Sequence, residues 1–168
     1  GSWPGNAWTS DYAQPTDAAP YERLGLSFAI MMSNGGVPLI YYGDEIGLAG
    51  GGDPDNRRAM PWSDSDLNPH QKALRTNVRA LSRLRADHRV LARGQRQTLH
   101  SDDDTWVYKK TGCGSSYTEA VIAINRADSS RQVPIPNGQW VDGITGDTVT
   151  AGAYTLSARD FLVLISAN

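Results

Sequence analysis

The sequence contains few of the residues that build metal and thiol sites. It has one cysteine, Cys113, and three histidines among 168 residues. A single cysteine excludes a disulfide within the chain, and this set leaves no zinc-type cluster of cysteines and histidines. Cys113 stands in a turn-like stretch with no histidine or basic residue directly beside it, so we do not expect an activated thiol there.

Long apolar runs and a large excess of one charge are also missing. No stretch approaches the roughly 20 apolar residues that span a membrane, and the net charge is −2 with a pI near 5.9. This balance argues against nucleic acid or a membrane as a partner. A hydrophobic content of 39% and a charged content of 20% are typical of a folded globular chain rather than a disordered one.

The first half of the chain predicts a helix followed by a buried strand. Apolar residues repeat at helical spacing from Pro20 to Ser33, and glycines follow. The run Val37–Tyr42 is apolar or aromatic throughout, which is typical of a parallel strand covered on both faces. It ends abruptly at Asp44 and Glu45, and charges at the end of a barrel strand are expected at an active-site mouth. A buried strand followed by a solvated turn is the plainer alternative.

The second half predicts another helix and then many strands. Asn68 is suited to cap the helix, with Pro69 at its first position and Gln71 reaching back in a capping box. The helix is expected to end near His88. Short alternating runs separated by turns then indicate an antiparallel sandwich. The expected strands are 95–99, 105–110, 117–125, 132–135, 139–142, 148–150, 154–156 and 161–165.

Two segments of the first half carry a family resemblance. GVPLIYYGDEIGL at residues 36–48 and DPDNRRAMPW at residues 53–62 resemble the eighth barrel strand and the following loop of the α-amylase family of glycoside hydrolases. A helix and a strand-rich tail follow, as at the end of that family's chain. The resemblance implies an α/β barrel fragment, the final βα units of a TIM barrel, at residues 1–89. It implies an all-β antiparallel sandwich domain at residues 90–168.

The resemblance also implies an activity for the intact protein. Such enzymes hydrolyse α-1,4-glucosidic bonds of starch or maltooligosaccharides by a retaining mechanism with two carboxylates. The family's three catalytic carboxylates come from barrel strands four, five and seven, so we expect them upstream of Gly1. This chain alone is then expected to be inactive and to need an upstream barrel fragment of the same protein as partner. A polymeric glucan substrate would favour an extracellular or periplasmic location.

The loop after the expected strand supplies the candidate substrate-binding residues. Its pattern is similar to the family's segment near the glucose pocket, which implies that Arg57 orients sugar hydroxyls. Asp55 would be the partner of Arg57 or a hydroxyl acceptor. Trp62 would wall the pocket, and Asp44 would support it from the strand's end. The alternative is that Asp55 and Arg57 only pin the loop to the barrel.

Two questions stay open in the sequence. Aspartates at Asp53, Asp55 and 102–104 raise the possibility of calcium, but their spacing is not that of an EF-hand and 102–104 is more simply a turn. We therefore expect no metal or other cofactor in this chain, while calcium is possible in the intact enzyme. The other open question is function, since the chain could instead be a non-catalytic glucan-binding module or part of a glucan-rearranging isomerase or transferase.

Overall fold

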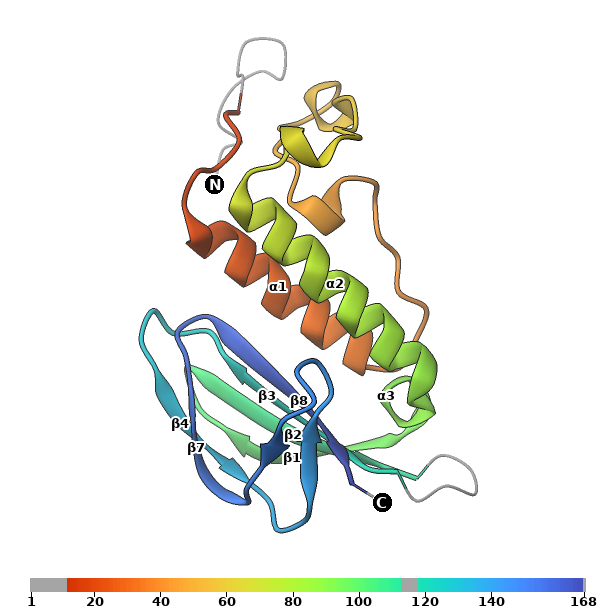
Figure 1. The fold of residues 1–168 in the computed structure, drawn as a ribbon, viewed down its shortest axis with the longest axis vertical. Helices are drawn as coiled ribbons and strands as arrows, with labels where there is room; N and C mark the ends of the chain where they lie inside the picture. Colours follow the sequence, from red (N-terminus) through yellow and green to blue (C-terminus); the bar gives the residue numbers. More distant parts are fainter. Residues whose placement is uncertain (1–11, 113–117, 168) are drawn as a thin grey trace.

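The computed structural model describes residues 12–112 and 118–167, so Cys113 lies outside the described part (Figure 1). Two long helices, α1 (Ala18–Ser33) and α2 (Pro69–Asp87), lie side by side over a β-sheet. A short helix, α3 (Arg89–Arg93), leads from α2 into the strands. The strands are β1 (Gln95–Ser101), β2 (Thr105–Thr111), β3 (Ala120–Asn125), β4 (Arg131–Ile135), β5 (Trp140–Asp142), β6 (Thr148–Val149), β7 (Gly152–Leu156) and β8 (Asp160–Ser166).

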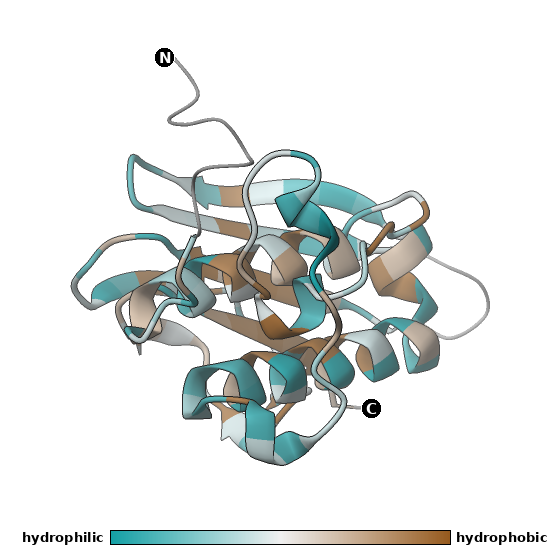
Figure 2. Cartoon of the chain, turned by 90° about the horizontal axis from the view of Figure 1, so that it is seen from above, coloured by the Kyte–Doolittle hydropathy of each residue, from teal (hydrophilic) through white to brown (hydrophobic). Residues whose placement is uncertain are grey.

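The strands form two antiparallel sheets. The larger has the order β1-β2-β3-β8-β5-β6, and β4 pairs with β7 in the smaller. Alternate residues of β3 point to opposite faces: Ile122 joins the core under the helices, whereas Val121 joins a second core against the small sheet. The chain is therefore layered as helices, large sheet and small sheet. In Figure 2 the central strands are brown, whereas the outward faces of the helices are largely teal.

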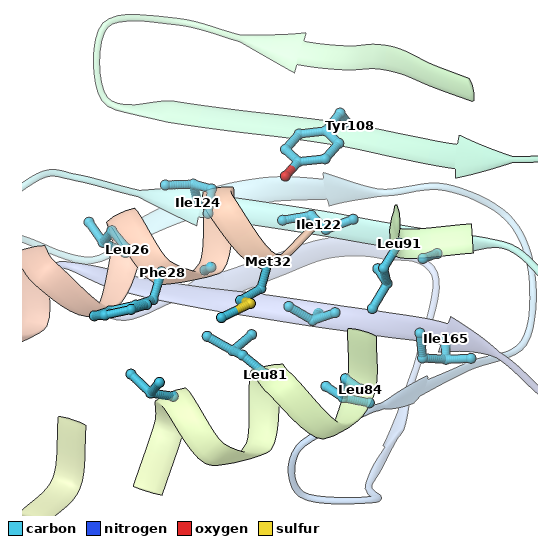
Figure 3. Close-up of a cluster of buried hydrophobic side chains, with 14 of the residues drawn as sticks. Leu26, Phe28, Met32, Leu81, Leu84, Leu91, Tyr108, Ile122, Ile124 and Ile165 are labelled. Carbon is cyan, nitrogen blue, oxygen red and sulfur yellow. The ribbon is translucent and has the colours of Figure 1, made fainter. Parts of the chain in front are cut away.

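The helices and the large sheet share one hydrophobic core, shown in Figure 3. Met32 of α1, Leu81 of α2 and Ile122 of β3 lie together in this core. Tyr108 of β2 is fully buried beside them, and its hydroxyl bonds Ser33 Oγ and accepts a 3.2 Å hydrogen bond from the Asn34 side chain. This core contains residues from both sides of the proposed boundary between residues 89 and 90. The division of the chain into two domains there therefore stays a prediction.

The predicted second helix is confirmed in detail. Asn68 Oδ1 accepts the Gln71 backbone N–H at 2.9 Å, and Gln71 Oε1 accepts the Asn68 backbone N–H at 3.1 Å. These are the two bonds of a capping box. The first helix is confirmed with a different start, since Pro20 is its third residue and Asp17 stands at the N-cap without a side-chain bond.

The predicted antiparallel strands are also confirmed, each within three residues at either end. Every one of the eight expected strands is present among the described residues, and the turn expected at 102–104 joins β1 to β2. The short helical elements were not predicted. Helix α3 and the three 3₁₀ turns η1 (Asp44–Ile46), η2 (Asp55–Arg57) and η3 (Asp64–Asp66) have too few residues for a periodic signal.

The predicted strand at residues 37–42 is wrong for this chain. No described residue pairs with this segment as a strand, and Val37 and Leu39 are 94% and 88% exposed. A strand buried on both faces needs a neighbouring strand at each edge and a covering layer on each face. Residues 12–112 and 118–167 supply no such neighbours, so the segment runs extended beside the helices (Figure 1).

Candidate functional site

The apolar segment ends in a tight turn that fixes its acidic residues. Gly43 and Gly47 both have left-handed backbone angles, and η1 lies between them. Asp44 accepts the Tyr41 backbone N–H at 3.2 Å, and Glu45 accepts the Gly43 backbone N–H at 2.9 Å. The two carboxylates therefore close a turn rather than ending a strand.

A hydrogen-bonded node holds the next stretch of the loop on the helices. The Gln14 side-chain amide donates to the Gly47 carbonyl and to the Tyr21 hydroxyl, both at 2.7 Å. Its oxygen accepts the Ala49 backbone N–H at 2.9 Å. Asn68 donates to the same Tyr21 hydroxyl at 3.0 Å. This node joins the segment before α1 to the loop and to the start of α2.

The loop is then closed by Asp55, whose partner differs from the predicted one. Arg58, not Arg57, makes a forked pair with Asp55, with Nε and Nη2 at 2.7 and 2.8 Å from the two carboxylate oxygens. The Gly51 backbone N–H donates to the same carboxylate at 2.7 Å. The hydrogen bond from Arg58, and then that from Gly51, lower the pKa of Asp55 below its usual value.

The geometry of η2 explains why the prediction chose the wrong arginine. Residues i and i+3 of a 3₁₀ turn are eclipsed, so Arg58 lies over Asp55. Arg57 points elsewhere and pairs with Asp53, with Nε 3.0 Å from the carboxylate oxygen. The sequence contained a usable signal, since a Pro-Asp-Asn step favours a tight turn and thus i, i+3 pairing. Arg58, Asp53 and Gln14 hold this loop through side-chain bonds, and the sequence-based prediction gave none of them that role.

Arg57 and Asp44 come together at an open groove of about 460 Å³. Its walls combine aromatic, polar and charged side chains. They are Tyr41, Tyr42, Asp44, Leu48, Ala49, Gly50, Asn56 and Arg57. Asp55 is turned away from this groove into its pair with Arg58, and Trp62, which is 87% exposed, is not among the walls. Of the four predicted substrate-binding residues, the structure thus unites two.

The groove resembles neither a metal centre nor a nucleophilic site. The described residues hold no group of three or more histidine, cysteine, aspartate or glutamate side chains suited to a metal ion. None of the helices in the described part is long and apolar enough to cross a membrane. A guanidinium beside aromatic rings and a carboxylate is suited to hydrogen-bonding a neutral polyhydroxylated ligand and packing against its apolar face.

Comparison with known proteins places the chain in a family. No family model matches it. It is 31% identical over 173 residues to an amylopullulanase of Thermoanaerobacterium saccharolyticum, covering 95% of this chain and 13% of the relative. It is 37% identical over 140 residues to a cyclomaltodextrinase of Geobacillus thermopakistaniensis, covering 80% and 23%. Cyclomaltodextrin glucanotransferases match as well.

A solved structure agrees with these relatives. An Anoxybacillus α-amylase superposes with a TM-score of 0.74 at 28% identity, covering 87% of this chain and 32% of that one. The chain therefore belongs to the α-amylase family of glycoside hydrolases, and it matches a C-terminal part of such proteins. It spans 13% and 23% of the lengths of the two hydrolase relatives.

Proposed function

We propose that this chain is the end of the catalytic barrel and the following β-sandwich of an enzyme that hydrolyses α-1,4-glucosidic bonds of starch or maltooligosaccharides. The observation that carries the proposal is the continuity of two features. An uncovered apolar segment, residues 37–42, runs directly into a groove that holds Asp44 and Arg57. A barrel strand that ends at a polar pocket would have this form.

The exposure of residues 37–42 supports the proposal that other barrel strands cover this segment in the intact protein. Val37, Leu39 and Ile40 are apolar and exposed, and large exposed apolar patches of this kind mark a surface that another part of a protein covers. Leu39 borders a hollow formed with Leu24, Phe28 and Met31 of α1, as expected for a strand packed on its own helix. The proposed partner is the upstream barrel fragment of the same protein, which would supply a strand at the open edge.

The loop residues would bind sugar without reacting. Arg57 keeps a long, exposed guanidinium at the groove, and Asp44 offers carboxylate oxygens nearby. All three glutamates of the chain have other partners: Glu22 pairs with Arg159, Glu119 pairs with Lys109, and Glu45 closes the turn. None is placed as a general acid, which supports catalytic carboxylates upstream of Gly1 and an inactive isolated chain.

The proposal is tested by assembling the two parts. The upstream part of the same protein and this chain are produced separately, and starch hydrolysis is measured for each and for the mixture. We expect activity only in the mixture or in the intact enzyme, with the first product in the α-anomeric form by NMR, as retention requires. Starch digestion by this chain alone, abolished by Glu45→Gln, would contradict the proposal.

A transferase is the second candidate, because glucanotransferases are among the relatives. Product analysis of the intact enzyme separates the two, since transfer yields cyclic or longer glucans and hydrolysis yields shorter linear ones. A binding module formed by residues 90–168 alone has less support. Its sheet would lose the cover of α1 and α2, exposing side chains such as Ile122 and Tyr108.

A further inference from the structure

Two adjacent arginines in the loop have different environments. The Arg57 side chain is 69% exposed and its partner Asp53 is 63% exposed. The Arg58 side chain is 24% exposed and its partner Asp55 is 17% exposed. Arg57 lines the groove, whereas Arg58 lies behind it and does not contribute to its wall. Two neighbouring arginines of one short turn thus differ in partner, in exposure and in whether they line the groove.

Arg58 connects three separate parts of the chain. Its fork holds Asp55 within η2, and its Nη1 donates to the Tyr12 carbonyl at 2.7 Å. The carbonyl of Arg58 accepts the Tyr42 hydroxyl at 3.2 Å, and Tyr42 is itself a wall of the groove. One residue therefore links the segment before α1, the loop and the end of the apolar run.

The loop has no hydrophobic anchor of its own that could replace these bonds. No residue of η2 is buried. The backbone is nevertheless tightly folded: a Cβ added to Gly51 would lie 2.5 Å from the Tyr12 ring, and one added to Gly50 would lie 3.0 Å from the Asp55 carbonyl oxygen. The fork from Arg58 and the bond from Gly51 both hold Asp55, and they tie η2 to the segment before it.

We propose that Arg58 is a positioning residue that, through Asp55, holds η2 so that Arg57 faces the sugar groove. This inference rests on the proposed function, because it assumes that Arg57 binds the glucan. A lysine cannot replace Arg58 fully, since an ammonium group lacks the planar fork that reaches both carboxylate oxygens and the Tyr12 carbonyl together. A purely structural Arg58 would stabilise the loop without acting through Arg57.

A double-mutant cycle in the intact enzyme separates these roles, with kcat and KM measured on maltohexaose. Arg57→Ala is expected to lower kcat/KM about tenfold to a hundredfold, the range for a hydrogen bond from a charged group. Arg58→Lys is expected to lower it about threefold to tenfold, mostly through KM, because binding is lost rather than chemistry. The kcat/KM of the double variant should be no lower than that of Arg57→Ala, since Arg58 is proposed to act only through Arg57.

Arg75→Lys is the matched control. Arg75 pairs with Asp64 at 2.8 Å, its side chain is as exposed as that of Arg58, and it lies outside the groove. Its substitution should leave kcat/KM unchanged. If Arg58→Lys prevents folding, Asp55→Asn takes its place in the cycle, because it removes the charge of the fork and keeps the size of the side chain.

The outcomes are distinct. Equal effects of Arg58→Lys in the presence and absence of Arg57 would overturn the inference, as would an unchanged kcat/KM for Arg58→Lys. An Arg57→Ala enzyme with full activity would overturn both this inference and the sugar-binding role of Arg57. The proposed function is tested separately, on the unmodified intact enzyme. If that enzyme does not hydrolyse starch, the proposed function is contradicted.

Discussion

Two mostly apolar runs of six residues are buried to very different degrees in this chain. Ala120–Asn125 forms β3, which is buried along its whole length. It is paired with β2 and β8 at its edges, and a hydrophobic core lies on each of its faces. Val37–Tyr42 is also mostly apolar but forms no strand, and all of its residues except Pro38 are exposed. The difference lies in the neighbours that the chain supplies. An apolar run specifies a strand only where strands for its edges and layers for its faces are present.

The largest expected contrast is between a core and an uncovered leucine. Leu81→Ala should destabilise this chain by about 2–5 kcal/mol, because it leaves a cavity in the core under the helices. Leu39→Ala should change stability by less than about 0.5 kcal/mol, because that side chain is already in solvent. Urea unfolding of the two variants measures both. A Leu39→Ala loss as large as that of Leu81→Ala would show that this chain buries residues 37–42 after all.

A smaller effect is expected at the start of α2, which belongs to the well-packed region. Asn68→Ala removes the capping bond to Gln71 together with the bond to the Tyr21 hydroxyl, and it should cost about 1 kcal/mol or more in the free energy of unfolding. Asn77→Ala, in the middle of the same helix, is the control and should cost nothing, because alanine is the better helix former there. Thermal and urea melts compare them. Equal losses for the two variants would contradict a capping role.

The smallest effect is expected in the loop and depends on pH. The pKa of Asp55 is lower in the folded chain than in the unfolded one, chiefly because of Arg58. Its ionised pair therefore stabilises the fold above the ordinary aspartate pKa of about 3.9, and this is lost as pH falls through the lower folded pKa. Unfolding midpoints of the unmodified chain and of Asp55→Asn should differ at pH 7, and the difference should shrink as the pH falls below the ordinary aspartate pKa of about 3.9. A constant difference would contradict this linkage.

The success of prediction follows the same division. The capping box of Asn68 and Gln71 and the short apolar run of β3 are local signals whose partners lie within the chain, so the sequence was sufficient to find them. The fate of Val37–Tyr42 depends on neighbours that the described residues do not include. The prediction of the partner of Asp55 was wrong for a third reason. The sequence pattern did not reveal the 3₁₀ turn, in which Asp55 and Arg58 are eclipsed.

Amide hydrogen exchange at Leu39 and Ile40 tests the central claim most directly, namely that residues 37–42 are a barrel strand without its neighbours. The two amides are compared in this chain alone and in the intact enzyme, with Ile122 of β3 as a protected reference in both. The account predicts rapid exchange in the isolated chain and protection like that of Ile122 in the intact enzyme. Rapid exchange in both would contradict it.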